Sequence, residues 1–157
     1  GEDDPTVTNP DVDVTDEDTA IVVDVLANDS DPDTTDNPLS VTNVVQPPAG
    51  QGSVVNNGNN VTFDPGTDFQ DLAVGETEIV KFTYDATTPG GGTTTENVTI
   101  TVVGTNNGPD AIDDAITTPE DTPVTVPVRG NDTDLEGEPL TVVQTSNPSN
   151  GVVTIDR

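Results

Sequence analysis

The sequence predicts an all-β protein made of immunoglobulin-like, seven-stranded β-sandwich modules in tandem, of which the second is incomplete. Three observations lead to this prediction. Short runs of alternating apolar and polar residues follow one another, and Gly, Pro and Asn separate them. No stretch shows helical periodicity of useful length. Acidic clusters recur at an interval of 103 positions, so that Glu17 returns as Glu120 and Asp31 as Asp134.

The first module is expected to hold seven short antiparallel strands, each with one face turned toward a core. The same interval maps the inward face of its second strand onto Val124, Val126 and Val128. In chain order, the predicted strands are an edge strand at 11–14; 21–25 with Ile21, Val23 and Val25 inward; 39–46 with Leu39, Val41 and Val45; 52–56 around Val54; 60–63 with Val61 and Phe63; 77–84 with Val80, Phe82 and Tyr84 inward and Lys81 outward; and 95–103 with Val98, Ile100 and Val102.

The segments between these runs carry turn residues. Asn57-Gly58 predicts a tight hairpin turn, and Pro47-Pro48 and residues 89–92 predict loops. Phe69 and Leu72, in the longer connection 64–76, are expected to close one end of the core.

The repeat divides the chain into a leading linker (1–10), a complete module (11–104), a calcium-binding linker (105–110) and the first half of a second module (111–157). The interval drifts to 101 at Leu39 and Leu140 and to 99 at Gly52 and Gly151, as expected if loops vary while strands are fixed. The second module has sequence for only four strands. Three explanations stay open: an arbitrary end of the sequence, a large insertion, or completion by strands of a neighbouring subunit.

The charge balance limits the partners. There are 30 acidic and 3 basic residues, giving a formal net charge of −27. Nucleic acid and anionic membranes are not expected partners, because phosphate binding needs basic patches and the only basic residues are Lys81, Arg129 and Arg157. No apolar run is long enough to insert into a membrane. Gly1 begins no signal-like segment, so the chain is expected to be a piece of a longer protein.

The acidic residues lie between the apolar runs, in the predicted end loops of the sandwich. Strand order would bring loops of the first module, the linker and the first acidic loop of the second module together where the modules meet. Hard oxygen ligands from several segments suit Ca²⁺, which takes six to eight. The chain has no Cys and many calcium-type oxygen ligands, and this combination favours an extracellular or cell-surface location. The candidate metal ligands are Glu17, Asp18, Asp29, Asp31, Asp33, Asp68, Asp71, Asn106, Asn107, Asp110, Asp113, Glu120, Asp132, Asp134 and Glu136.

Each cluster also has a simpler interpretation as a solvated acidic loop, since Asp, Asn and Gly favour turns without a metal. The segment Asp29-x-Asp31-x-Asp33 is not an EF-hand loop, because Thr34 stands where Gly is required and Ser40 where Glu is required. Its counterpart from Asp132 has Gly137 but Val143 at the Glu position.

Four segments stand out together: Thr62-Phe63-Asp64-Pro65, residues 69–77, Phe82-Thr83-Tyr84 and residues 98–109. In combination they resemble the VCBS and cadherin-like repeats of giant bacterial surface adhesins. That resemblance implies type I-secreted, repetitive proteins that calcium makes rigid and that serve attachment and biofilm formation. It also implies that Glu17 and Glu120 match the acidic residue after the first strand, Asn106, Asn107 and Asp110 the linker motif, and Asp132 and Asp134 the paired aspartates of the next module. Asn107-Gly108 departs from the usual Asn-Asp.

The expected function is a calcium-rigidified extender module of an extracellular adhesin or filament, in contact with neighbouring repeats of its own chain. A carbohydrate-binding module is the second interpretation. Outward Thr residues could also suit ice binding, but they are ordinary on a sandwich face. Enzymatic activity is not expected, because the chain has no His, no Cys and few basic groups for acid–base chemistry.

Overall fold

The computed structural model describes residues 4–156, which form two compact units on either side of the Asn106–Asn107 bond. Unit 1 ends at Asn106 and unit 2 begins at Asn107. No helix among the described residues has the length and apolar character needed to cross a bilayer.

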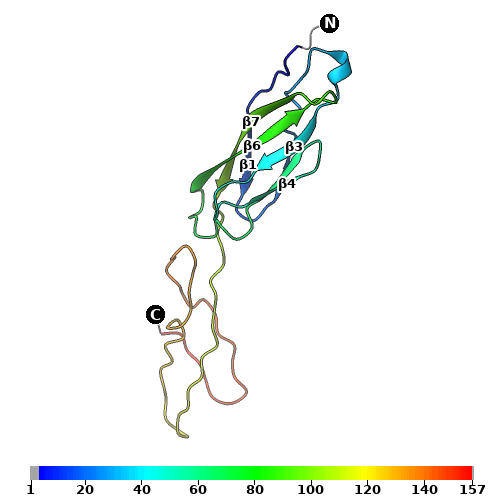
Figure 1. Ribbon diagram of the computed structural model, residues 1–157. Coiled ribbons are helices and arrows are strands. Elements are labelled where there is room, and N and C mark those ends of the chain that lie inside the picture. Colours follow the sequence, from blue (N-terminus) through cyan, green and yellow to red (C-terminus); the bar gives the residue numbers. More distant parts are fainter. Residues whose placement is uncertain (1–3, 157) are drawn as a thin grey trace. The chain divides into compact units, whose positions relative to one another are not determined.

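Unit 1 is a sandwich of two sheets (Figure 1). One sheet has the strand order β1-β7-β6-β3, and the other has the order β2-β5-β4. A single 3₁₀ turn, η1 (Thr34–Asp36), lies in the loop between β2 and β3. The strands are β1 (Asp11–Asp16), β2 (Ile21–Val23), β3 (Ser40–Val45), β4 (Ser53–Asn56), β5 (Val61–Asp64), β6 (Thr77–Thr87) and β7 (Thr93–Val103). The predicted all-β sandwich of seven strands is confirmed.

One pairing differs from the prediction of antiparallel strands throughout. β1 runs parallel to β7, with Asp11 opposite Val98 and Asp16 opposite Val103. The alternation of apolar and polar residues has the same period in parallel and antiparallel strands, so the sequence carried no sign of this direction. As a consequence, β1 and β7 end side by side at the C-terminal end of unit 1.

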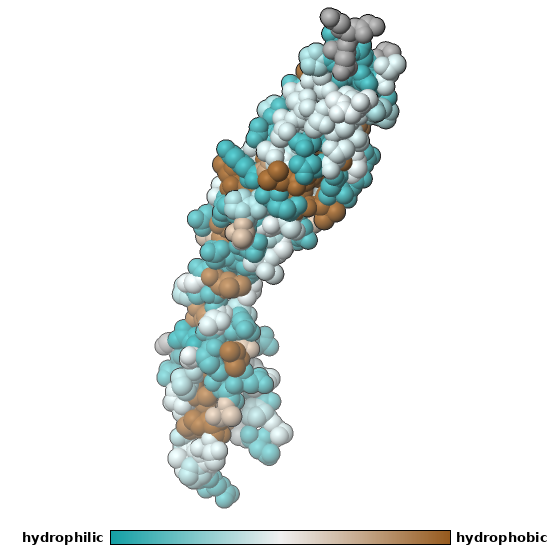
Figure 2. All heavy atoms as spheres, in the orientation of Figure 1, coloured by the Kyte–Doolittle hydropathy of each residue, from teal (hydrophilic) through white to brown (hydrophobic). Residues whose placement is uncertain are grey.

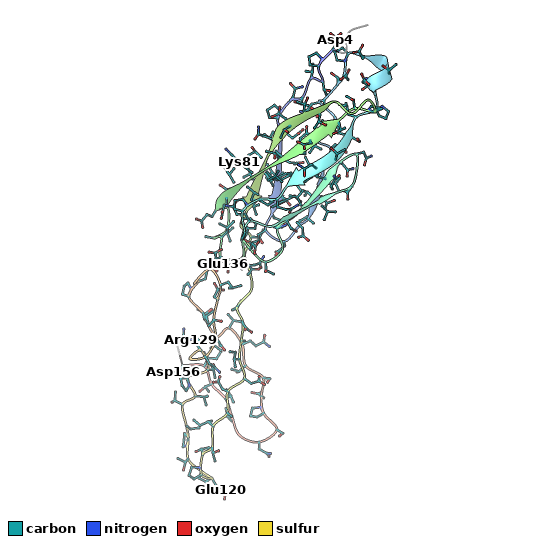
Figure 3. The ribbon with its side chains drawn as sticks, viewed as in Figure 1. Asp4, Lys81, Glu120, Arg129, Glu136 and Asp156 are labelled. Carbon is teal, nitrogen blue, oxygen red and sulfur yellow. The ribbon has the colours of Figure 1, made fainter. Side chains whose placement is uncertain are left out.

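The core lies between the two sheets and follows the predicted inward faces closely. The rings of Phe63 and Phe82 stack across it, with centroids 6.5 Å apart. Phe69 and Leu72 are buried in the same cluster, as predicted for the connection before β6. Lys81 points away from the core on β6 (Figure 3), also as predicted. The buried apolar side chains are Val23, Val25, Val41, Val54, Val61, Phe63, Phe69, Leu72, Val80, Phe82, Tyr84, Ala86, Val98, Ile100 and Val102.

The third strand departs from its predicted inward face. A β-bulge between Val41 and Asn43 shifts the register against β6 by one residue. Because a shift of one residue turns every later side chain to the other face, Val44 packs against the core and Val45 is 56% exposed. The prediction for Val45 was therefore wrong. Leu39 is half-buried and precedes the strand.

The β4–β5 hairpin is confirmed, with a loop of residues 57–60 between its strands. Gly58 takes a φ of +92°, which favours glycine, and the Asn57 amide donates to the Asn60 carbonyl at 3.0 Å.

Unit 2 contains no strand among its described residues, and the predicted inward face at Val124, Val126 and Val128 is not formed. Val124 is 45% exposed and Val128 is 39% exposed. One isolated β-bridge joins Asp110 to Thr133. Without strands to cover them, apolar side chains of unit 2 reach the surface, where they appear as brown spheres (Figure 2).

Candidate functional site

The tightest acidic cluster of the described residues lies in the loop between β2 and β3. Carboxylate oxygens of Asp31, Asp33 and Asp36 all lie within 4.8 Å of one another. Asp31 is buried, and the other two are half-buried. η1 places Asp36 one turn beyond Asp33, because its backbone amide donates to the Asp33 carbonyl at 3.0 Å. Three converging carboxylates form a hard oxygen donor set of the kind that Ca²⁺ binds.

Hydrogen bonds hold this cluster in place. Asp31 accepts the Thr6 hydroxyl at 2.8 Å on one oxygen and the Asp33 amide at 2.9 Å on the other. Asp33 accepts the backbone amide of Asp4 at 2.8 Å. Asp4 lies at the N-terminal end of unit 1 (Figure 3). The Asn37 side chain donates to the carbonyls of Asp31 and Asp33 at 3.0 and 3.1 Å. The loop therefore orients its carboxylates and also fastens the segment that leads into β1.

Asp29, a predicted metal ligand, takes part in a hydrogen-bond network at the N-terminal end of unit 1. Its carboxylate accepts the Asn9 amide at 2.9 Å and lies 2.6 Å from the Tyr84 hydroxyl. That hydroxyl also lies 2.7 Å from the Val25 carbonyl oxygen. Burial and the neighbouring carboxylates raise the pKa of Tyr84, so the phenol keeps its single proton for these two acceptors. Asp29 thus joins the N-terminal segment to the core.

At the C-terminal end of unit 1, the loop after β1 meets the end of β7. Glu17 is fully buried, and the Thr105 hydroxyl donates to its Oε1 at 3.1 Å. Asp18 accepts the Gln70 side chain at 2.9 Å. Asp68 accepts the Gly52 amide at 2.8 Å, and Asp71 is exposed. These four acids share one end of unit 1, as predicted, but in residues 4–156 they do not converge as closely as Asp31, Asp33 and Asp36 do.

Unit 2 repeats the hydrogen bonds of the N-terminal end of unit 1 at the interval of 103. Asp132 accepts the Ile112 amide at 2.9 Å, as Asp29 accepts that of Asn9. Glu136 accepts the Asn107 amide at 3.2 Å, as Asp33 accepts that of Asp4. The bridge of Asp110 to Thr133 matches that of Val7 to Ser30. We call the two carboxylate-to-amide bonds and the adjoining β-bridge, in either unit, the acidic clamp.

The remaining candidates of unit 2 are spread over it. Asp134 accepts the Glu138 amide at 2.9 Å, and the Asp113 carbonyl accepts the Asn131 side chain at 3.5 Å. Glu136 and Glu120 lie at opposite ends of the unit (Figure 3). The Asn107 side chain donates to Glu136 at 2.8 Å. Asn106, the last residue of unit 1, is exposed.

A family model described as the bacterial Ig domain matches residues 2–101 and again residues 106–157. The chain belongs to the bacterial Ig domain family. The second match is about half as long as the first. A search of curated proteins found no match.

Membership of the bacterial Ig family makes both units copies of one structural repeat, a module type that is not enzymatic. The first match begins at residue 2, so it includes the residues expected to form a leading linker. In the structure, residues 4–9 are fastened to the Ig module by the acidic clamp.

Three residues of the acidic sites in unit 1 were not predicted from the sequence. Asp36 completes the carboxylate cluster, Thr6 holds Asp31, and Thr105 holds Glu17. A signal for Asp36 was present, because its spacing of three from Asp33 is that of one helical turn. Thr6 and Thr105 are polar residues in segments with no distinguishing pattern, and only the fold brings them to their partners.

Asp11 adds a pH-sensitive group beside Tyr84. The pKa of its carboxyl is raised from 3.8 to about 6, chiefly because burial disfavours the ionised form, and the charges of Asp29 and Glu96 act in the same direction. Native Asp11 therefore holds its proton more tightly than the unfolded chain does. Its contribution to stability is complete below the unfolded pKa of 3.8 and is lost as the pH rises through about 6.

We expect the Asp11→Asn variant to be more stable than the wild type at about pH 8, on the order of 1 kcal/mol after allowing for solvent screening. The amide imitates the protonated carboxyl, so the difference should disappear at about pH 4. Urea unfolding at both pH values measures it. Asp13→Asn, an exposed position on the same strand, is the control and should show no such difference. An equal effect of both variants would assign the change to net charge instead.

Proposed function

We propose that this chain is an extender of an extracellular bacterial adhesin or filament, made of Ig modules that calcium makes rigid. Tandem copies of a complete sandwich extend a chain by simple addition, since each complete module has its own core, as unit 1 does. The resemblance to VCBS and cadherin-like adhesin repeats favours attachment or a biofilm matrix as the setting. A cell-surface location, reached by type I secretion, belongs to the same proposal.

The convergence of Asp31, Asp33 and Asp36 carries the calcium part of the proposal. Three carboxylates within 4.8 Å repel one another unless a cation or solvent screens them. The donor set fits Ca²⁺, because all three groups offer hard oxygens and the hydrogen bonds from Thr6 and Asn37 keep the loop in place. Bound calcium would supply positive charge to a chain with a net charge of −27.

Through the acidic clamp, the carboxylate cluster is bonded to the segment that leads into β1, so the state of the cluster affects how firmly that segment is held. Asp33 accepts the backbone amide of Asp4, in the segment that leads into β1, and Glu136 accepts that of Asn107 at the start of unit 2. Calcium that neutralises Asp33 and its neighbours would remove the repulsion that favours opening of the loop. In the proposal, an ion held by this end loop limits movement of the segment at residues 4–9 that leads into β1.

We expect Ca²⁺ to raise the melting temperature of the chain, with affinity in the range of roughly 10⁻⁴–10⁻³ M that extracellular calcium modules show. At about 10 mM Ca²⁺, binding of this strength stabilises the native state by about 1–3 kcal/mol. Calorimetric titration and thermal unfolding measure the two effects. Small-angle scattering, with and without EDTA, measures the stiffening.

The Asp33→Asn, Asp36→Asn double variant should lose most of this calcium response. Asp24→Asn is a suitable control, because it also removes negative charge from an exposed loop position outside the cluster. If neither the melting temperature nor the scattering curve changed with Ca²⁺ up to about 10 mM, calcium would be ruled out as the source of rigidity. The extender role without calcium would survive that result.

No observation favours the carbohydrate-binding alternative. The chain has three Phe, one Tyr and no Trp, and all four aromatic side chains are buried. An exposed aromatic platform for a sugar ring is therefore missing. Reproducible binding on a glycan array would reverse this judgement.

A further inference from the structure

Exposed apolar side chains lie on the outer face of the four-stranded sheet of unit 1, the face turned away from the core. They come from three strands, and they alternate with buried residues because successive side chains of a strand point to opposite faces. Val14 on β1 is 61% exposed and Ile79 on β6 is 57% exposed, whereas the adjacent Thr15 and Val80 are buried. The exposed apolar residues of this outer face are Val12, Val14, Val45 and Ile79.

The strand register makes these side chains neighbours. Thr101 pairs with both Val14 and Ile79, so the three residues form one row across β1, β7 and β6. Thr99 pairs with Val12 in the next row. Threonine is uncharged and partly apolar, so no charge separates the larger side chains within the first row. The exposed apolar residues are therefore grouped rather than scattered, and grouped apolar surface marks an interaction site.

The outer face also lacks the negative charge that covers the rest of the chain. Lys81, which points away from the sheet (Figure 3), completes the second row beside Thr99 and is the only basic residue of unit 1. Asn97, Thr83 and Val45 form the third row. None of these nine positions, three in each row, is acidic, although the chain has 30 acidic residues.

Carboxylates border the outer face instead of lying within it. Asp16 follows Val14 by two residues on β1, and Asp85 follows Thr83 by two residues on β6. The Asp85 carboxylate is held in place by the Thr95 hydroxyl at 2.6 Å and the Asn43 side chain at 3.1 Å. An apolar centre with a polar rim is the arrangement found in protein interfaces.

We propose that unit 1 pairs through this outer face with the same face of a second copy of the chain. Charge selects the partner, because the chain has a net charge of −27. A basic partner would be attracted to the acidic loops at the ends of the module, away from this face. A second copy is repelled by those loops and can approach only where carboxylates are absent from both surfaces. The interface is isologous, since both copies contribute the same residues.

The size of the outer face makes the pairing of one module weak. With strands about 4.8 Å apart and a rise of about 3.3 Å per residue, the face covers on the order of 500 Å². A stable complex buries about 800 Å² on each partner. Weak contacts repeated along tandem modules strengthen one another, because the first contact raises the effective concentration of the next. Such pairing is suited to association of long chains side by side.

Sedimentation equilibrium of the full 157-residue chain in EDTA tests the pairing without bound calcium. We expect a monomer–dimer equilibrium with a Kd on the order of 10⁻⁴ M at about 0.15 M salt. Lowering the salt to about 0.01 M should weaken dimerisation severalfold, because repulsion between two acidic copies is then less screened. Amide shifts of the ¹⁵N-labelled chain should change with concentration most strongly in β1, β6 and β7. Failure of the calcium proposal would leave these results unchanged.

A matched pair of double variants locates the interface. Val14→Asp with Ile79→Asp places like charges on both copies and should weaken dimerisation at least about tenfold. Val22→Asp with Val55→Asp adds the same charge to the outer face of the other sheet, where Thr62 pairs with both valines as Thr101 does in the first row. This control should change the Kd by no more than about twofold at about 0.15 M salt.

A milder variant separates loss of pairing from loss of folding. Val14→Thr with Ile79→Thr keeps β-branched side chains that favour strands, so the melting temperature should be retained while dimerisation weakens severalfold. A chain that stays monomeric at about 1 mM and about 0.15 M salt overturns the proposal. Dimerisation that survives the aspartate variant of Val14 and Ile79 also overturns it, because another surface would then hold the copies together.

Discussion

Replacing Phe63 by Ala is expected to lower the free energy of unfolding of unit 1 by about 3–5 kcal/mol. Phe63 is fully buried on β5, and its ring stacks on Phe82 of β6 at 6.5 Å. The two residues belong to different sheets, so the pair joins the layers of the sandwich. Loss of the ring removes apolar burial and leaves a cavity that the flanking strands cannot fill.

Urea unfolding followed by circular dichroism measures this loss. The matched control is Val55→Ala on the adjacent strand β4, since Val55 is 57% exposed. It should change stability by no more than about 0.5 kcal/mol. If Phe63→Ala cost less than about 1 kcal/mol, the two sheets would not share one core.

The long strands of unit 1 could be predicted from sequence because their alternation is regular. In β6 and β7, apolar residues occupy every second position from Val80 to Tyr84 and from Val98 to Val102, and all face the core. Periodicity says which face is buried, but it does not say which strand lies alongside. The parallel pairing of β1 and the bulge after Val41 are determined by tertiary packing. The segment 40–45 contains no Gly or Pro from which the bulge could be predicted.

The repeat reveals part of the candidate site, and the spacing of Asp36 from Asp33 is a weaker signal for the rest. Asp29, Asp31 and Asp33 have acidic counterparts at the interval of 103, and the structure gives Asp29 and Asp33 the same hydrogen-bonding role as those counterparts. Asp36 has Pro139 at that interval, so repetition could not select it. Its importance comes from η1, which turns its carboxylate toward Asp31 and Asp33.

The spacing of the acidic residues also could not show that their carboxylates accept hydrogen bonds from backbone amides. Asp29 and Asp132 accept amides from residues 20 positions earlier in the chain. Turn preference and metal affinity both favour Asp in such loops. The structure adds a third reason, because an ionised carboxylate that accepts an amide fixes the segment leading into the module.

Gly104→Ala is expected to destabilise unit 1 by about 3 kcal/mol, at the upper end for overpacking. Gly104 is buried where β7 ends, and a Cβ there would lie 2.7 Å from both the Cβ and the carbonyl oxygen of Leu72. Backbone must move to make room, because the Gly104 amide is also bonded to the Glu76 carbonyl at 2.8 Å.

The same movement should reach the C-terminal acidic site. Thr105 follows Gly104 directly and donates to the buried Glu17 at 3.1 Å. Gly108→Ala is the control, since a Cβ at Gly108 meets nothing within 4 Å. Urea unfolding of both variants gives the comparison, and equal stability would mean that the loop at residues 72–76 yields freely. A large loss for Gly104 alone would instead show that close packing behind the end of β7 stabilises unit 1, at the strand end from which Thr105 reaches Glu17.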